Sequence, residues 1–442
     1  MQLSNREQLL RVAEPWRSRR RLALELVERT LASLDPYAST LESLQTVFPR
    51  GAATDSWEFV VFALGKAAGP MARAALDYLE PTAGYVLSPA EIPGLAPPPG
   101  RPTIVQLVGS HPTPSPDAPE QARRVLSALR ALDSRHHLVC LISGGGSSLL
   151  ELPRAGVSLE ELSQTSERLM NAGADIQALN VVRRALSQVK GGGLLRASGT
   201  QRVTNFILSD VVLGPLYAVA SGPTLPVTEP AQSARQILED FGVRDALPSA
   251  VVAALDRAVS APSSSATEPL TTPPTWLVAD NERGVRLLVE HAATVGVKLQ
   301  VQTQPLQGDA AQTGADLAGR ISARQSVSGI AMGGETTVRL DVTEPGAGGR
   351  NQELILGAAR AALRDGGFSG TLVSFGSDGI DGQSPAAGAL LDQAVLATLD
   401  TSQVEQALAR HDSYSLLEDK GAALISGATG TNVADLLFWL PE

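Results

Sequence analysis

The stretch HLVCLISGGGSSLLEL, residues 137–152, shows the pattern that recurs along this chain. An apolar run of strand length leads into a turn of small residues, and a helical pattern follows. The same order recurs at residues 57–79 (WEFVVFALGKAAGPMARAALDYL), 103–132 (TIVQLVGSHPTPSPDAPEQARRVLSALRAL) and 202–212 (RVTNFILSDVV). Such alternation is typical of βαβ units and a mainly parallel sheet. The sequence therefore predicts an α/β fold.

One segment interrupts this alternation. Residues 261–274, APSSSATEPLTTPP, contain little but small, polar and Pro residues, which is typical of a linker. Strand-like runs then resume within residues 275–303, 327–342, 371–382 and 422–437. A chain of 442 residues is longer than one hydrophobic core usually serves. We therefore expect two α/β domains with mainly parallel sheets, at residues 1–258 and 275–442, joined by a linker at 259–274.

The composition narrows the range of partners. A net charge of -10 and a pI of about 5.2 argue against a nucleic-acid surface, which would show an excess of Lys and Arg. The basic cluster at residues 17–21, RSRRR, lies in a helical pattern, and we interpret it as a solvated helix face. The single Cys excludes an intramolecular disulfide, and the five His show no zinc-site spacing. We found no signal-peptide or membrane-spanning run, so we expect a cytoplasmic protein that binds neither nucleic acid nor membranes.

Polar residues gather where the predicted strands end. In open α/β sheets, ligands bind beyond the carboxyl ends of the strands. Taken singly, each Gly, Ser or Asp there is explained by a turn or a helix cap, but their number predicts a polar ligand cleft. In the first domain the residues are Lys66, His111, Ser143, Gly144, Gly145, Gly146, Ser147, Ser148, Ser209 and Asp210. In the second they are Asn281, Gly334, Glu335, Asp378 and Asp381.

Two cations in this set suggest binding of an anion. Lys66 directly follows an apolar run, which places its ammonium group beside the next helix N-terminus, where it could oppose a phosphate. Arg350 follows a Gly-rich loop and opens a helix, where its guanidinium could grip a carboxylate or phosphoryl group, or simply pair with Glu353. The bare amides of residues 144–146 could approach an oxyanion, although a purely structural turn would explain the glycines equally well.

Three common site motifs fail on spacing. The P-loop pattern fails at LGKAA because position 60 is Val and position 67 is Ala. The hydrolase pattern Gly-x-Ser-x-Gly fails because Leu149 stands at its last position, and the dinucleotide pattern Gly-x-Gly-x-x-Gly fails there too. The remaining parts are backbone donors, Lys, Arg and carboxylates able to hold Mg²⁺, which are the parts that phosphoryl transfer needs.

Several motifs together resemble those of the type II glycerate kinases, whose C-terminal part is a MOFRL domain. They occur in the expected order over about residues 60–436: LGKAAGPMA, SHPTP, LISGGGSSLL, LNVVRRALSQVKGG, ILSDVV with ASGPT, GGETTVRL, GGRNQEL, GSDGIDG and TGTNVADL. Each is weak alone, but the set is highly specific.

The resemblance implies a Mg²⁺-dependent kinase that transfers the γ-phosphate of ATP to D-glycerate and forms 2-phosphoglycerate. It also implies a Rossmann-like first domain and an active site in the cleft between the two domains. We expect a monomer or homodimer. By motif, the family's essential lysine is Lys66 and its essential arginine is Arg350. Asp210, Asp378 and Asp381 then become the candidates for binding magnesium, and Asp210 also for accepting the hydroxyl proton. His111, Ser209, Asn281, Gly334, Glu335 and the loop 143–148 would bind substrate or phosphate.

The chain departs from the family pattern at four positions. Gly214, Tyr217 and Pro385 stand where acidic residues are usual, and Gly193 stands where a basic residue is common. The general base and the metal ligands are therefore left open. Two alternatives also stay open: a hydroxypyruvate reductase, a name often given to this family, and a non-catalytic sensor of a phosphorylated acid or sugar. The reductase would need an acidic ribose ligand about 20 residues after the glycine loop, where Glu167 lies in a helical pattern.

Overall fold

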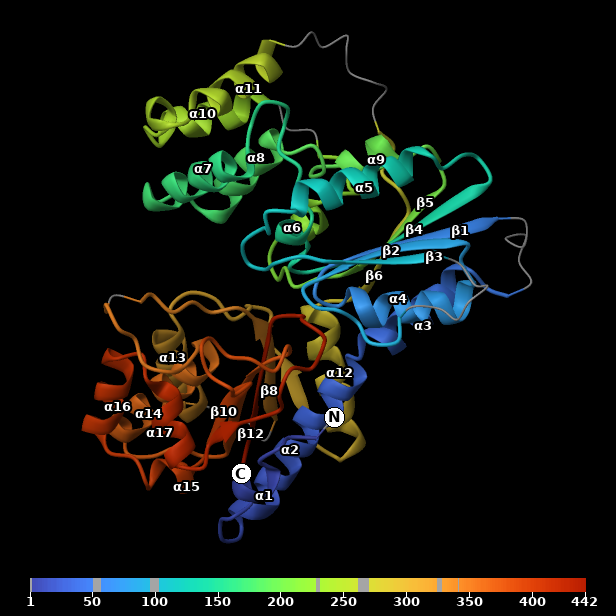
Figure 1. Cartoon of the computed structure of the whole chain (residues 1–442). Coiled ribbons are helices and arrows are strands. Elements are labelled where there is room, and N and C mark those ends of the chain that lie inside the picture. The colour runs from blue at the N-terminus through green and yellow to red at the C-terminus, as the bar shows by residue number, and fades with distance from the viewer. Residues whose placement is uncertain are drawn as a thin grey trace. The chain divides into compact units, whose positions relative to one another are not determined.

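The computed structural model describes residues 2–50, 57–95, 103–227, 231–260, 270–323, 328–340 and 342–442. The chain forms two compact units. The N-terminal unit consists of Pro36–Ser209 and Leu213–Val278, and the C-terminal unit of Met1–Asp35, Asp210–Val212 and Ala279–Glu442. Each unit contains one six-stranded sheet with helices packed on it, so the predicted α/β class is confirmed (Figure 1).

The sheet of the N-terminal unit has the strand order β3-β2-β1-β4-β5-β6. All four pairings from β3 to β5 are parallel. This is the strand order of the doubly wound, Rossmann-like fold, in which the chain first builds outward from β1 on one side and then from β4 on the other. The strands are β1 (Glu58–Leu64), β2 (Ala83–Ser88), β3 (Thr103–Val108), β4 (His136–Ser143), β5 (Val203–Leu208) and β6 (Thr275–Ala279).

Helices cover both faces of this sheet. Helices α3 and α4 lie on one face, and α5 and α9 lie on the other (Figure 1). The strand β4 is buried from its second residue to its last, as expected for a strand between two helical layers. The helices that pack on or near the sheet are α3 (Pro36–Val47), α4 (Ala68–Leu79), α5 (Ala118–Arg130), α6 (Gly146–Leu149), α9 (Gly193–Ala197) and the 3-10 helix η1 (Leu216–Ser221).

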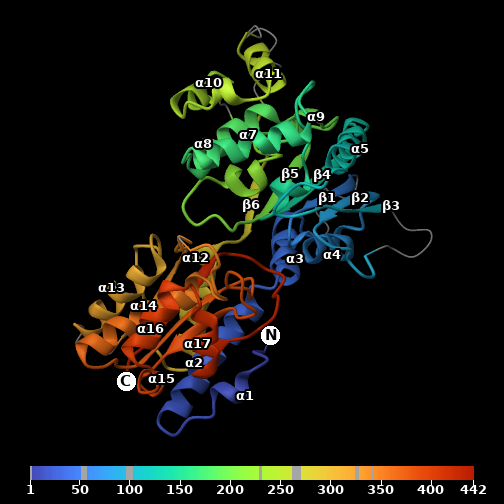
Figure 2. The same ribbon diagram turned by 60° about the vertical axis from the view of Figure 1, so that its left-hand side comes forward.

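Four further helices of this unit form a small core of their own. They are α7 (Leu159–Asn171), α8 (Ile176–Leu186), α10 (Ala231–Asp240) and α11 (Ser249–Ser260), with the short η2 (Arg244–Ala246) between the last two. Leu169, Leu186 and Val251 are among its fully buried side chains. In Figures 1 and 2 these helices stand together, away from the sheet. The sequence pattern does not separate this helical group from the sheet domain.

The sheet of the C-terminal unit has the order β11-β10-β9-β12-β8-β7. Only β7–β8 is parallel, and the other four pairings are antiparallel. The prediction of a mainly parallel second sheet is therefore wrong, because the last strand, β12, inserts between β8 and β9 in the opposite direction and β10 returns beside β9. The strands are β7 (Leu299–Val301), β8 (Gly329–Gly334), β9 (Thr371–Gly376), β10 (Gly388–Leu391), β11 (Ala423–Leu424) and β12 (Asp435–Leu440).

The end of the chain explains part of this difference. The apolar pattern at residues 422–437 suggested a strand followed by a helix, but it forms the two-residue strand β11, a loop and the start of β12. Every residue of β12 is buried, so its continuous apolar run is that of a central strand and not of a helix.

Two helical layers enclose the second sheet. Helices α2 and α12 pack on one face, and α14, with α13, α16 and α17, packs on the other (Figure 1). The helices of this unit are α1 (Arg6–Leu9), α2 (Trp16–Ser33), α12 (Asn281–Thr294), α13 (Ala310–Ser322), α14 (Arg350–Asp365), α15 (Gln393–Leu396), α16 (Thr401–Ala409) and α17 (Ser413–Asp419). None of the helices among the described residues is long and apolar enough to cross a bilayer.

The first 35 residues belong to the C-terminal unit, whereas the sequence analysis assigned them to the first domain. A buried ion pair holds them there. Arg20, only 2% exposed, donates from Nε and Nη2 to the two carboxylate oxygens of Asp392, at 2.7 and 3.0 Å, and from Nη1 to the carbonyl of Leu9. The interpretation of residues 17–21 as a solvated face is therefore wrong for Arg20, although Arg17 and Arg21 are exposed.

The expected boundary at the linker also differs from the structure. Residues 259 and 260 end helix α11, and residues 261–269 lie outside the described residues. The strand β6, expected to begin the second domain, lies next to β5 in the first sheet. A backbone bond from Asn205 to Pro274 and a side-chain bond from Asn205 to Thr275 support this placement.

Candidate functional site

The carboxyl ends of β1 and β4 lie side by side in the first sheet, and the loops that follow them bond directly to each other. The amide of Lys66 donates to the carbonyl of Gly144 at 2.9 Å, and the amide of Ala67 donates to Ser143 Oγ at 3.0 Å. Ser143 Oγ in turn donates to the carbonyl of Leu64 at 3.3 Å. The strand order reverses direction between β1 and β4, which is where ligands bind in doubly wound folds.

The glycines of this site have packing reasons of their own. A Cβ on Gly65, whose φ is +120°, would lie 2.3 Å from Ser143 Oγ. A Cβ on Gly146 would lie 2.8 Å from the Cβ of Ala220. Gly145 has a φ of +81°, and its missing side chain leaves room for the aliphatic stem of Lys66, whose Cγ lies 3.0 Å from the ideal Cβ position. The loop is thus bare partly so that Lys66 can lie across it.

The helix that follows the glycines is short. Helix α6 has only four residues, so its dipole adds little to the attraction of an anion. The sequence predicts that amides at the start of this helix bind phosphate. The structure leaves the positive charge of Lys66 as the stronger attraction for an anion at this loop.

His111 lies against the same loop. Its Nδ1 and Ser148 Oγ are 3.0 Å apart, and Ser148 Oγ donates to the carbonyl of Gly145 at 3.3 Å. Desolvation lowers the pKa of His111, and the positive charge of Lys66 lowers it further. The imidazole is therefore neutral at pH 7 and can serve as a hydrogen-bonding group. Lys66, His111 and the loop 143–148, which the sequence analysis proposed separately, lie together in the structure.

Sequence reasoning missed a buried ion pair beneath this loop. Lys190 Nζ donates to the carbonyl of Ser147 at 2.8 Å and pairs with Glu151, whose other oxygen accepts from Ser187 Oγ at 2.6 Å. Lys190 and Glu151 are 5% and 3% exposed. Ser147 Oγ also lies 2.9 Å from Ser221 Oγ. Lys190 stands inside the motif LNVVRRALSQVKGG, so the sequence did carry a signal for it.

The remaining predicted residues of this region follow β5. Ser209 is buried, whereas Asp210 is half-buried and belongs to the C-terminal unit. Two of the departures from the family pattern lie nearby. The ring of Tyr217 lies under the guanidinium of Arg184, with Cζ 5.4 Å from the ring centroid. A Cβ on Gly193 would lie 2.2 Å from the carbonyl oxygen of Gln188, which explains why no side chain stands there.

In the C-terminal unit, Arg350 is the first residue of α14. Its Nε and Nη2 donate to the carboxylate of Asp435, the first residue of β12, at 2.5 and 3.0 Å, and its Nη1 pairs with Glu335 at 2.8 Å. Although burial alone disfavours the cation, these carboxylates raise the pKa of Arg350. Burial raises the pKa of Asp435, against the opposing effect of Arg350 and Asn351. The guanidinium is therefore permanently charged, and Asp435 holds it in place.

Asp381 caps the same helix. Its two oxygens accept from the amides of Asn351 and Gln352, at 3.0 and 2.9 Å, and from the side-chain amides of both residues, at 3.2 and 2.9 Å. Burial raises the pKa of Asp381, while these four donors favour its charged form. Because its oxygens are already used, these contacts favour a structural role over magnesium binding.

Asp378 has a different environment. It is half-buried just after β9, and its Oδ1 accepts from the amide of Ile380 at 3.2 Å. Among the described residues, no three or more His, Cys, Asp or Glu side chains are grouped so that they could hold a metal ion. A magnesium ion that keeps its waters and binds substrate phosphates needs only one or two carboxylates. Asp378 therefore fits this requirement better than Asp381 does.

Two predicted binding residues serve the packing of the second sheet. Asn281 Nδ2 donates to the backbone carbonyls of Val433 and Asp435, at 2.7 and 3.0 Å. Gly334 has a φ of +153°, and a Cβ there would lie 2.3 Å from the backbone of Leu306. Both residues help to pack the strands around β12, and neither lines the cavity at Arg350.

A cavity of about 330 Å³ lies over Arg350 and Glu335. Glu353 and His411 also line it, and His411 Nδ1 lies 2.8 Å from Glu353 Oε1. Burial raises the pKa of Glu353, and the bond to His411 opposes this shift. Sequence reasoning missed His411 and Asp435. Asp435 is the only carboxylate in the motif TGTNVADL, which was a usable signal, whereas no motif marked His411.

Comparison with known proteins agrees with these motifs. Residues 22–256 match the domain described as "Domain of unknown function (DUF4147)", and residues 328–435 match the MOFRL family. A glycerate 2-kinase from Pyrococcus horikoshii is 32% identical to this chain over 434 residues, covering 95% of this chain and 96% of the relative. The chain belongs to the glycerate 2-kinase family.

Other comparisons support the same family. The crystal structure of glycerate kinase from Thermotoga maritima has a TM-score of 0.82 and 32% identity, covering 96% of this chain and 99% of that one. A relative from Agrobacterium vitis, 34% identical and covering 85% of this chain and 97% of its own length, carries the name putative hydroxypyruvate reductase. Relatives of this chain thus carry two functional names, glycerate 2-kinase and putative hydroxypyruvate reductase.

Proposed function

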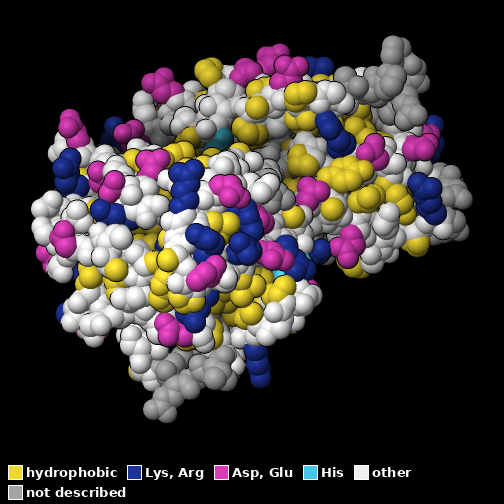
Figure 3. Space-filling view, turned by 90° about the horizontal axis from the view of Figure 1, so that it is seen from below, with side chains coloured by type: hydrophobic (Ala, Val, Ile, Leu, Met, Phe, Trp, Pro, Cys, Tyr) yellow, Lys and Arg dark blue, Asp and Glu magenta, His cyan; other side chains and the backbone are white. Residues whose placement is uncertain are grey.

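We propose that this protein is a glycerate 2-kinase, which transfers the γ-phosphate of ATP to D-glycerate and forms 2-phosphoglycerate. The observation that carries the proposal is the similarity over nearly the whole chain to relatives named glycerate 2-kinase. The surface agrees with a small-molecule enzyme, because positive and negative side chains are interspersed on the face in Figure 3, unlike the basic face of a nucleic-acid-binding protein. We also propose a cytoplasmic location and a monomer or homodimer.

Lys66 is proposed to neutralise phosphate charge. Its backbone is held by the loop after β4, and its stem lies over Gly145, so its ammonium group is carried at the reversal point of the first sheet. A fixed cation there costs little reorganisation when charge develops on a transferring phosphoryl group. Nε2 of neutral His111, the ring nitrogen not used by Ser148, is proposed to form a hydrogen bond with the same ligand.

Arg350 is proposed to bind the carboxylate of glycerate. Asp435 uses Nε and Nη2, which fixes the plane of the guanidinium and leaves Nη1 directed to Glu335. Glu335 is 47% exposed, whereas Asp435 is 1% exposed, so Glu335 is the partner that a substrate carboxylate can replace. We infer that the Glu335 carboxylate stands where the carboxylate of the substrate binds.

Asp210 is proposed to accept the hydroxyl proton of glycerate and, with Asp378, to hold magnesium. Bound Mg²⁺ would neutralise charge on the phosphate oxygens. This assignment rests on the family motifs and on the partial exposure of both carboxylates.

The test is turnover with D-glycerate, ATP and Mg²⁺, with 2- and 3-phosphoglycerate resolved by ³¹P NMR. Wild type is expected to form 2-phosphoglycerate, and Lys66→Met to lower kcat/KM by about a hundredfold or more, as expected when a charge acting on the transition state is lost. The matched control is Lys298→Met, an exposed lysine that lines neither cavity, which should keep wild-type turnover.

Two outcomes would contradict the proposal. One is the absence of phosphoglycerate when the wild-type protein is folded by circular dichroism. The other is oxidation of NADH with hydroxypyruvate at a rate exceeding phosphorylation, which would support the reductase alternative. Equal losses of kcat/KM in the Lys66 and Lys298 variants would contradict only the proposed role of Lys66, and not the kinase activity.

A further inference from the structure

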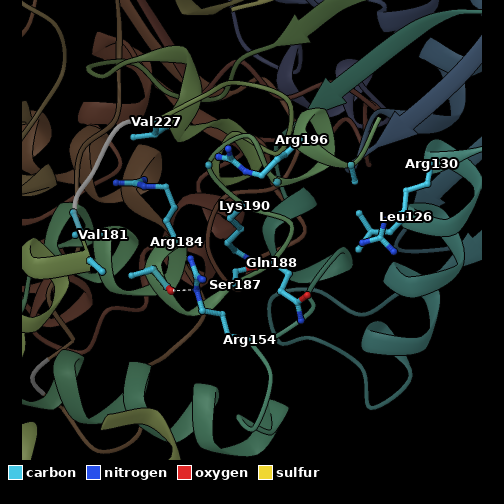
Figure 4. A pocket seen from close by; sticks show the side chains of 15 residues that line it. Leu126, Arg130, Arg154, Val181, Arg184, Ser187, Gln188, Lys190, Arg196 and Val227 are labelled. Carbon is cyan, nitrogen blue, oxygen red and sulfur yellow. Dashed lines mark hydrogen bonds between the residues drawn. The ribbon is translucent and has the colours of Figure 1, made fainter. Parts of the chain in front are cut away.

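A second cavity, of about 460 Å³, lies in the N-terminal unit among α5, α8 and α9. Five cationic residues line it: Arg130, Arg154, Arg184, Lys190 and Arg196. Figure 4 shows Arg154 and Arg196 beside the cavity, on different segments of the chain, with the stem of Lys190 between them. Neither Lys66, nor His111, nor any residue of the loop 143–148 lines this cavity.

The cationic residues of this cavity differ in what lies next to their charges. None of the described residues that line it is acidic. Glu151 neutralises Lys190 from below, and Arg184 lies over the ring of Tyr217. In the part of the chain that the structure describes, no carboxylate pairs with Arg130, Arg154 or Arg196. The cavity thus carries the positive charges of these three arginines, on a protein with a net charge of -10.

An anion bound among these arginines would relieve the repulsion between their charges. Like charges at close range repel, and desolvation together with the charge of Arg196 lowers the pKa of Arg154. Natural chains keep local conflicts of this kind mainly at functional sites. The planar, permanently charged guanidinium binds phosphate and carboxylate oxygens in pairs, which suits it to anion sites.

We propose that this cavity is a binding site for a small organic phosphate carrying at least three negative charges. The three arginines Arg130, Arg154 and Arg196 match such a charge. Leu126, Val181 and Val227 supply an apolar wall for the carbon part of the ligand. A phosphorylated carboxylic acid and a nucleoside triphosphate share this chemistry. The inference does not depend on the proposed kinase activity, because it concerns binding alone.

The lining of the cavity is connected by hydrogen bonds to the candidate binding loop 143–148. Lys190 donates to the carbonyl of Ser147. The next residue, Gly191, donates from its amide to the carbonyl of Ser221, whose Oγ lies 2.9 Å from Ser147 Oγ. Hydrogen bonds of Lys190, Gly191 and Ser221 therefore connect the lining of the cavity to the loop 143–148.

The test is isothermal titration of the full-length protein at about 50 mM salt with 3-phosphoglycerate, ATP and inorganic phosphate as separate probes. The variants are the double substitution Arg154→Gln with Arg196→Gln, and Arg196→Gln alone, whose side chain makes no hydrogen bond among the described residues. Arg123→Gln, an exposed arginine of α5 outside the cavity, is the matched control. The variant Lys66→Met distinguishes binding in this cavity from binding at Lys66 and the loop 143–148.

We expect at least one organic phosphate to bind to the wild-type protein, and binding at this site to persist in Lys66→Met. The double variant should weaken it at least tenfold and Arg196→Gln alone at least threefold, while Arg123→Gln leaves it unchanged. Preference for 3-phosphoglycerate would identify a phosphorylated acid, and preference for ATP a nucleotide. Either preference supports the site. The proposal is overturned if no organic phosphate binds more tightly than inorganic phosphate, if the arginine variants bind as wild type does, or if Lys66→Met removes all binding.

Discussion

Replacing Asp435 with Asn is expected to destabilise the packing of α14 against β12 by about 3 kcal/mol. Asp435 is fully buried and accepts two bonds from Arg350 and one from Asn351, at 3.0 Å. Removing one partner of a buried ion pair costs about 3–5 kcal/mol, because the other charge is left without compensation. Since the side chain of Arg350 is 33% exposed, water compensates part of that loss, and the lower end of the range applies.

Hydrogen exchange read by mass spectrometry measures this effect locally. A loss of about 3 kcal/mol in the opening free energy of peptides from α14 and β12 corresponds to an increase of about 150-fold in exchange rate. The matched control is Asp365→Asn at the other end of α14. Its ion pair with Arg364 has side chains 45% and 78% exposed, so the expected change is within about 0.5 kcal/mol. Equal protection in the two variants would refute the reasoning.

Three further predictions concern packing and titration. Gly314→Ala should lower the free energy of unfolding in urea by more than about 2 kcal/mol, because its Cβ would lie 1.9 Å from the carbonyl oxygen of Leu354 in α14. Gly319→Ala in the same helix meets no atom within 4 Å and should raise it by up to about 1 kcal/mol. A similar result for both variants would exclude the steric cause. Burial lowers the pKa of His137 to about 4, below the usual 6.5, so the unfolded chain binds the proton more readily than the folded chain does. The free energy of unfolding should therefore fall by about 3 kcal/mol as the pH drops from 7 to 4, and His137→Gln should reduce this pH dependence. Burial raises the pKa of the Cys140 thiol well above its usual range, so the native protein should not react with a disulfide reagent at pH 8. The urea-unfolded protein should react with one equivalent of the reagent. Reaction of the native protein would contradict the burial of Cys140 in β4.

Residues close together in the sequence determined much of this protein without help from tertiary contacts. Apolar runs followed by small residues located β1, β4, β5 and β9, and therefore the turns that carry Lys66 and the loop 143–148. This works because a parallel strand buried on both faces is an uninterrupted apolar run, and because the turn after it needs residues without bulky side chains. The spacing of Arg350 after a Gly-rich loop likewise located the start of α14.

Contacts between distant residues were decided only by the tertiary structure. Arg350 is paired with Asp435, 85 positions away, and Arg20 with Asp392, 372 positions away, and neither pairing leaves a periodic signal along the chain. The direction of β12 could not be predicted either, because a buried strand has the same apolar run whether it lies parallel or antiparallel to its neighbours. The local sequence determines which segments form strands and which turns carry polar groups. The partner and direction of each strand, and the pairing of each buried charge, depend on which distant residues the folded chain places next to it.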